Sequence, residues 1–139
     1  MTSNAQEIAM SDITKQEVEA AQEIWGQGVI DIGSVFQEGG DYTARAKEHV
    51  DALYAYAMGD VVFKPTLAAA AQFRNDTVGA LSYFVGGNAV EGGYDEDAGF
   101  AINGGKGWKD VVFTNHQIDV NGLTAIAMGE YVFTCASTD

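Results

Sequence analysis

Residues Gly107–Cys135, with the sequence GWKDVVFTNHQIDVNGLTAIAMGEYVFTC, carry the strongest structural pattern in this 139-residue chain. Two long runs rich in β-branched and aromatic residues flank the dipeptide Asn121-Gly122. Both central residues of a type I′ turn need a positive φ angle, which Asn and Gly tolerate best. The stretch therefore predicts a β-hairpin whose strands are joined by a two-residue loop.

The faces of this hairpin follow from its register. If Val120 pairs with Leu123, the other pairs are Ile118 with Ala125, His116 with Ala127, Val112 with Tyr131 and Trp108 with Cys135. The opposite face then carries Val111, Phe113, Ile126, Met128, Glu130 and Val132. A strand with one wet face alternates apolar and polar residues, whereas this one is apolar on both faces. We therefore expect earlier residues to cover one face and a second subunit, in a homodimer through the sheet, to cover the other.

The composition restricts the class of protein. Twenty Asp and Glu residues outnumber seven Lys and Arg residues, which gives a net charge of −13, and nucleic acids and anionic membranes would repel such a surface. The single cysteine excludes an internal disulfide and a cysteine-cluster metal site, and we expect neither a metal nor a cofactor. No apolar run reaches the roughly 20 residues of a membrane span, and the first residues lack the features of a signal peptide. A cytoplasmic protein is expected.

Local signals predict the remaining elements. Residues 1–10 are polar and predict a disordered tail before a single domain at 11–139. Thr14 and Glu17 have capping-box spacing and predict a helix that ends at Gly39-Gly40. Asp41 is a good N-cap for a second helix, which is expected to run to Gly59. We expect these to be followed by a short strand at 60–65, a helical stretch at 67–73, a helix at 78–85 capped by Thr77, and a glycine-rich mobile loop at 86–107.

Five stretches carry a resemblance to a known group of folds: the opening helix through Trp25, then VFKPT at 62–66, GALSYF at 79–84, GFAI at 99–102 and AMGEYVF at 127–133. The chain resembles the NTF2-like superfamily, also called SnoaL-like or cystatin-like, and looks like an uncharacterised bacterial branch of it. The resemblance implies an α+β cone, with N-terminal helices packed on a curved, mainly antiparallel sheet. The usual last strand is missing from this sequence, so we expect a partner chain or an early segment to cover the open edge.

The resemblance also implies a pocket lined by aromatic residues for a small apolar or aromatic ligand. The candidate lining residues are Trp25, Tyr54, Phe63, Phe73, Tyr83, Trp108, Phe113, Met128 and Tyr131. Aromatic residues at such spacing are also typical of a plain core, and a large pocket would decide between the two interpretations. Arg74 is a further candidate, because its guanidinium could bind a substrate carboxylate or could pair with an acidic residue of the chain.

Two residues are candidates for acid–base chemistry. His116 could act as a general base near neutral pH, or it could lie half exposed near the end of the hairpin. Glu130 has apolar neighbours on its expected face, and burial there would raise its pKa; on a solvent-facing side it would be an ordinary polar position. His49 is expected on the surface of the second helix.

The sequence leaves the function open between two classes. One is a small-molecule pocket protein with acid–base isomerase, lyase or hydrolase activity. The other is a non-catalytic oligomerisation or accessory domain whose interior is closed. A cavity of several hundred Å³ that contains Glu130, His116 or a tyrosine hydroxyl would favour the first class.

Overall fold

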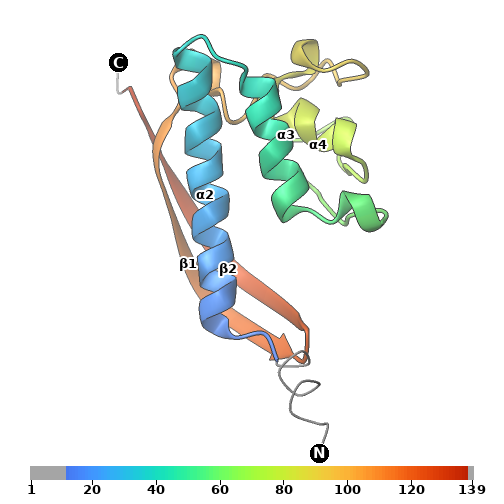
Figure 1. The fold of residues 1–139 in the computed structure, drawn as a ribbon, viewed down its shortest axis with the longest axis vertical. Coiled ribbons are helices and arrows are strands. Elements are labelled where there is room, and N and C mark those ends of the chain that lie inside the picture. Colours follow the sequence, from blue (N-terminus) through green and yellow to red (C-terminus); the bar gives the residue numbers. More distant parts are fainter. Residues whose placement is uncertain (1–11, 138–139) are drawn as a thin grey trace, which may run out of the picture.

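The computed structural model describes residues 12–137, so the tail expected at 1–10 lies outside the described residues. The elements are the helices α2 (Lys15–Gln37), α3 (Tyr42–Leu53) and α4 (Thr77–Val85) and the strands β1 (Trp108–Asn121) and β2 (Thr124–Cys135) (Figure 1). Short 3-10 helices lie at Tyr56–Met58, Gly87–Ala89 and Asn103–Gly105. The expected α+β class, with N-terminal helices packed on an antiparallel sheet, is confirmed. No helix of the described part of the chain is both long and apolar enough to cross a membrane.

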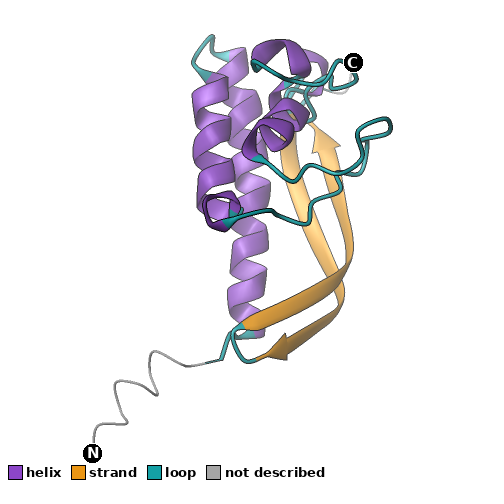
Figure 2. Ribbon diagram, turned by 90° about the vertical axis from the view of Figure 1, so that its right-hand side faces the viewer, coloured by secondary structure: helices purple, strands orange, loops and turns teal. Residues whose placement is uncertain are grey.

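The long helix α2 begins and ends where its sequence signals predict. The Thr14 hydroxyl accepts a hydrogen bond from the Glu17 N–H (3.1 Å), and the Glu17 carboxylate accepts one from the Thr14 N–H (2.9 Å). These two bonds are the predicted capping box. The helix lies along one face of the hairpin (Figure 2). Gly26 permits this close packing, since a Cβ there would lie 3.0 Å from the Cβ of Val111.

The second helix, α3, starts at the predicted cap but ends early. Asp41 accepts a hydrogen bond from the Ala44 N–H at 3.0 Å, as expected of an N-cap. The helix ends at Leu53, not at Gly59, and a 3-10 turn follows. The third helix, α4, is capped by Asp76, whose carboxylate accepts from the Gly79 N–H, and not by Thr77.

The hairpin is confirmed, whereas its register was predicted wrongly along most of its length, since Ile118 pairs with Ala127 and Val112 with Val132. Asn121 pairs with Thr124, so the loop is Gly122-Leu123. Gly122 has a φ of 62° and occupies the first loop position, where type II′ turns place glycine. The predicted pairing of Trp108 with Cys135 is nevertheless present, because the register shifts twice along β1, between 108 and 110 and between 115 and 117. Such irregularities add an extra residue to one strand.

The hairpin is covered on one face only within the single chain. On the covered face, Asn115 exchanges hydrogen bonds of 2.8 Å with Gln22 of α2. On the other face, Ile126, Met128 and Val132 are 70%, 71% and 55% exposed. Within residues 12–137, protein therefore covers only one face of the hairpin, not both as expected. The second subunit, which was expected to cover the other face, stays a prediction.

Residues 60–73 contain neither the strand expected at 60–65 nor the helix expected at 67–73. Val62 is fully exposed, and the Arg74 N–H donates to the Phe63 carbonyl at 2.8 Å. The N–H groups of 69–71 donate to a side chain, not to helical carbonyls. The apolar pattern alone predicted the wrong structure here, because the described backbone hydrogen bonds join residues 61–63 to residues 74–75 at two points and form no regular β-ladder.

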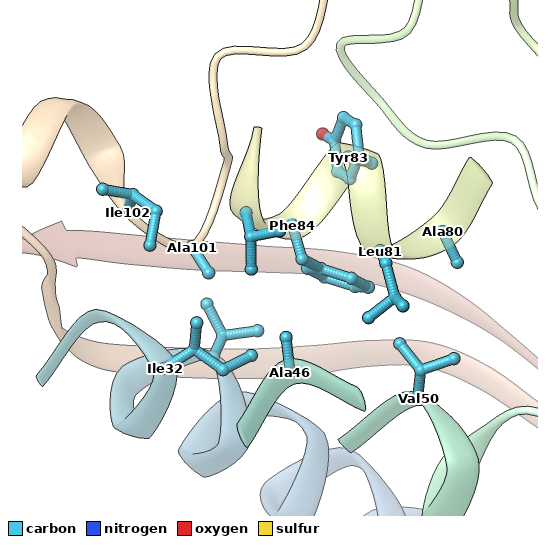
Figure 3. Close-up of a cluster of buried hydrophobic side chains, with 11 residues drawn as sticks. Ile32, Ala46, Val50, Ala80, Leu81, Tyr83, Phe84, Ala101 and Ile102 are labelled. Atoms are coloured by element: carbon cyan, nitrogen blue, oxygen red, sulfur yellow. The ribbon is translucent and has the colours of Figure 1, made fainter. Parts of the chain in front are cut away.

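The hydrophobic core lies where α4 packs over α2 and α3 (Figure 3). Its fully buried side chains include Ile32, Val50 and Phe84. The loop expected to be mobile at 86–107 is tied to this core, since Phe100 N–H and Ala101 N–H donate to the carbonyls of residues 83 and 84. The fold therefore holds the loop, α4 and the base of the hairpin together around one core.

Candidate active site

An open aromatic groove lies between α2 and β2. Its volume is about 460 Å³. Five of the candidate lining residues from the sequence meet there: Trp25, Tyr54, Phe63, Phe113 and Tyr131. Trp25 stacks on Tyr131 with ring centroids 5.8 Å apart, and its indole N–H donates to the Tyr54 hydroxyl at 2.8 Å. We call this space the aromatic groove.

Two further candidates lie in a second hollow, which we call the side pocket. Tyr83 and Trp108 line it together with Leu67, Glu96, Asp97 and Phe100, and its volume is about 310 Å³. Tyr83 stacks on Phe100 at 5.6 Å. Met128 and Phe73, in contrast, are 71% and 66% exposed and line neither space.

The segment Thr66-Leu67 connects the groove to the side pocket. The Thr66 hydroxyl lies 3.1 Å from the Tyr131 hydroxyl, and the Leu67 N–H donates to the Tyr83 hydroxyl at 3.3 Å. We call Thr66, Tyr83 and Tyr131 the hydroxyl cluster. Sequence analysis missed Thr66 as a functional residue, because nothing in its neighbourhood along the chain shows that it meets a tyrosine of β2.

The hydroxyls of Tyr54 and Tyr83 are neutral and can donate hydrogen bonds. Burial raises the pKa of Tyr83, and burial likewise raises the pKa of Tyr54 above its ordinary value. Tyr83 accepts from Leu67 N–H and Tyr54 accepts from Trp25 N–H, so the O–H of each tyrosine can still donate to a bound molecule. The site can thus supply several neutral donors beside apolar rings.

Arg74 has the second of the two roles considered for it, a pair with acidic residues of the chain. Its guanidinium is buried and makes two bonds to the Asp97 carboxylate, at 2.7 and 2.9 Å. It also donates to the carbonyls of Ala71 and Gly79, both at 2.8 Å. The hydrogen bond to Asp97 raises the pKa of Arg74. Binding of a substrate carboxylate is not supported, because the donors are already occupied.

The two acid–base candidates lie outside the aromatic groove. His116 is exposed at the second register shift of β1. Glu130 is exposed opposite Thr114, because the face expected to bury it is uncovered. Glu130 does line a shallow hollow that shares Phe113 and Tyr131 with the groove. Their catalytic roles stay predictions.

His49 was expected on the surface and is buried instead. Its side chain is 3% exposed, and its Nε2 has no hydrogen-bond partner among the described residues. The imidazole fits against Gly28 of α2, where a Cβ would overlap it. Burial lowers the pKa of His49 from 6.5 to about 4, so the imidazole is neutral at pH 7. The glycine in α2 was the available signal that a large side chain packs there.

Within residues 12–137, no three His, Cys, Asp or Glu side chains converge in a way that could hold a metal ion. The family profile described as metal-independent carbonic anhydrase matches residues 16–139. The chain belongs to the metal-independent carbonic anhydrase family.

Individual relatives agree with this membership in the metal-independent carbonic anhydrase family. A metal-independent carbonic anhydrase of Nostoc sp. (strain PCC 7120) is 38% identical over 125 residues, which cover 88% of this chain and 58% of that relative. The chain thus spans less than two-thirds of the length of this relative. A crystal structure of the iota-carbonic anhydrase from a cyanobacterium, complexed with bicarbonate, has a TM-score of 0.78 at 38% identity, covering 89% of this chain and 74% of that one.

These similarities correct two expectations from the sequence. The chain is not a member of an uncharacterised NTF2-like or SnoaL-like branch, because the carbonic anhydrase profile covers it almost completely. The expected isomerase, lyase or hydrolase activity and the expected non-catalytic accessory role are both wrong, because the relatives found are carbonic anhydrases. The stretches that suggested the resemblance contribute mainly to packing, and packing does not specify a reaction. The small apolar or aromatic ligand expected from the sequence stays a prediction.

Proposed function

We propose that this protein is a metal-independent carbonic anhydrase, which converts CO2 and water to bicarbonate and a proton and catalyses the reverse reaction. The observation that carries the proposal is the family match over residues 16–139. The similarity to a carbonic anhydrase complexed with bicarbonate supports it. Since the chain spans 58% of the curated relative, activity of this chain itself is part of the proposal.

The aromatic groove suits the substrate CO2. The molecule is small and carries no net charge, and apolar pockets with a few convergent polar groups are typical ligand sites. The rings of Trp25, Phe63 and Tyr131 provide the apolar surface. The hydroxyl cluster supplies polar groups at the edge of the groove, where Thr66 contacts Tyr131.

The chemistry requires stabilisation of negative charge and removal of one proton. As the water oxygen bonds to carbon, one C–O π bond breaks and negative charge develops on the CO2 oxygens. Tyr83, whose oxygen accepts from the Leu67 N–H, keeps its O–H free to donate to those oxygens, and so does one member of the Thr66–Tyr131 pair, since one of these two hydroxyls donates to the other. Donors fixed in place before reaction stabilise such charge strongly. The proton of the attacking water passes to Glu130, whose carboxylate lines the hollow next to the groove.

A stopped-flow assay with a pH indicator tests this function. The chain is first dialysed against a chelator, and CO2 hydration is then measured against buffer alone. We expect catalysis that survives the chelator and falls about 100-fold in Tyr83→Phe, which loses one donor but keeps its ring on Phe100. Tyr42→Phe is the control, because Tyr42 packs on Phe36 and lies outside both the aromatic groove and the side pocket that Tyr83 lines. A wild-type rate equal to that of buffer, or an unchanged rate in Tyr83→Phe, would refute the proposal.

We also propose that the protein forms a homodimer through the uncovered face of the sheet. The support is the exposure of three large apolar side chains, Ile126, Met128 and Val132, on the uncovered face of β2. Contiguous apolar patches on a soluble surface commonly mark interaction sites. The cytoplasmic location remains an expectation from the sequence, which cell fractionation would test.

A further inference from the structure

Three successive backbone N–H groups converge on the carboxylate of Glu96. Ala69 N–H and Ala70 N–H donate to Oε1 at 2.8 and 3.1 Å, and Ala71 N–H donates to Oε2 at 2.6 Å. Successive N–H groups that point the same way form an anion-binding concavity. These bonds lower the pKa of Glu96, with that from Ala71 the largest cause, so the side chain is a carboxylate at neutral pH.

The segment that Glu96 holds has little other support. Residues 60–73 contain no helix or strand, so they lack a regular ladder of backbone hydrogen bonds. The described bonds within the segment are few, such as Ala68 N–H to the Pro65 carbonyl at 3.3 Å. Charge-assisted hydrogen bonds are about twice as strong as neutral ones. Arg74 supports the same residues from the carbonyl side, since its Nε–H donates to the Ala71 carbonyl at 2.8 Å and its guanidinium lies 3.7 Å from the Glu96 carboxylate. The carboxylate of Glu96 is the group that binds the N–H groups of residues 69–71.

Thr66 and Leu67 come shortly before residues 69–71. The Thr66 hydroxyl contacts Tyr131, and the Leu67 N–H contacts the Tyr83 hydroxyl. Both contacts are long for their type, at 3.1 and 3.3 Å. They therefore depend on the position of the backbone at Thr66 and Leu67. The placement of the hydroxyl cluster is thus coupled to the segment that Glu96 holds.

We propose that Glu96 is a positioning residue of the hydroxyl cluster: by binding the N–H groups of residues 69–71, it holds Thr66 and Leu67 against Tyr131 and Tyr83. The proposal rests on the proposed carbonic anhydrase function. A displacement of about 1 Å at a catalytic group can cost roughly 100-fold in rate. Removal of the carboxylate is therefore expected to slow the reaction without removing any group that touches substrate.

The neighbouring acids have different surroundings, which makes the role of Glu96 separable. Asp97 is buried, pairs with Arg74, and accepts from the Ser82 hydroxyl at 2.5 Å. This pair keeps loop 86–99 attached to α4 when Glu96 is changed. Asp95 is exposed, and the described part of the chain shows no hydrogen bond or ion pair for it. Asp95→Asn is therefore a matched control for loss of one negative charge.

Hydrogen exchange measured by mass spectrometry tests the ordering directly in the full chain. In Glu96→Ala we expect exchange at residues 66–73 to rise at least about tenfold, with α2 and the hairpin unchanged. Glu96→Gln should give a smaller rise, because its amide oxygen can still accept. Sodium formate, a small carboxylate, should restore part of the protection in Glu96→Ala by occupying the vacated N–H groups. Unchanged exchange at 66–73 in Glu96→Ala would overturn the proposal.

Kinetics separate positioning from general stability. We expect kcat/KM for CO2 hydration to fall about 10- to 100-fold in Glu96→Ala, to recover partly with formate, and to stay unchanged in Asp95→Asn. Raised exchange with an unchanged kcat/KM would overturn the positioning role. A wild-type chain that hydrates no CO2 would refute the proposed function instead, and the exchange experiment would still decide whether Glu96 orders residues 66–73.

Discussion

Protonation of His49 is expected to destabilise the fold at mildly acidic pH. The imidazole is 3% exposed, and the rings of Phe84 and Trp25 flank it at 5.5 and 6.1 Å. Burial lowers the pKa of His49 from 6.5 to about 4, the charge of Arg45 lowers it further, and Asp31 opposes the shift. The folded chain therefore resists protonation at a position where the unfolded chain accepts it.

The size of the effect follows from this shift. Between pH 6.5 and about 4, the unfolded chain binds a proton at His49 that the folded chain does not bind, so the free energy of unfolding falls as the pH falls. At 1.36 kcal/mol per pKa unit, the complete shift corresponds to about 3 kcal/mol. About 2 kcal/mol of this is lost between pH 7.5 and pH 5. Above pH 6.5 the stability is fully retained.

Urea denaturation at pH 7.5 and pH 5 measures this difference. In His49→Leu, which cannot titrate, the decrease in unfolding free energy between the two pH values should be about 2 kcal/mol smaller than in the wild type. The comparison uses the change with pH, so a constant packing defect in the variant cancels. His116→Gln, at the other histidine of the chain, is the comparison variant, since His116 is exposed. The same pH dependence in His49→Leu and the wild type would refute the reasoning.

Three further predictions concern the core, the proton acceptor and the dimer. Trp25→Ala should lower the unfolding free energy by about 3–5 kcal/mol, because its indole contacts rings from both strands; a loss below about 1 kcal/mol in urea denaturation would contradict this. Glu130→Gln should lower kcat for CO2 hydration and leave the melting temperature unchanged, whereas an unchanged kcat would exclude Glu130 as the proton acceptor. Sedimentation should show a wild-type dimer that Ile126→Glu converts to a monomer, and a monomeric wild type would refute the dimer.

The sequence predicted the features that depend on local interactions. The start of α2 follows from Thr14 and Glu17, which are three residues apart and satisfy each other's backbone groups. The hairpin follows from two β-rich runs beside a turn dipeptide. Its register did not follow, because the two shifts along β1 depend on packing against α2 and on the opposite strand. Gly28 was the sequence signal for the buried His49, because a side chain at this position of α2 would overlap the imidazole.

The candidate site was predicted only in part, for a related reason. Aromatic residues cluster wherever a small domain buries its core, so Trp25, Tyr54 and Tyr131 could be placed together from their periodicity and resemblance. Thr66 could not, because its contact with Tyr131 spans 65 residues. The bonds from residues 69–71 to Glu96 likewise span 25 to 27 residues and replace a helix that the local sequence favours.

Neutral donors are also what an acidic chain can offer to an anion. The net charge of −13 raises the energy of bicarbonate near the surface, and Arg74, a natural carboxylate ligand, is already neutralised by Asp97. Hydroxyl groups stabilise charge that develops on CO2 without a fixed cation that would hold the product after reaction. Binding that is stronger in the transition state than in the product complex raises turnover. Under the proposed carbonic anhydrase function, tyrosine and threonine hydroxyls on a negatively charged protein would therefore favour formation of bicarbonate and its release.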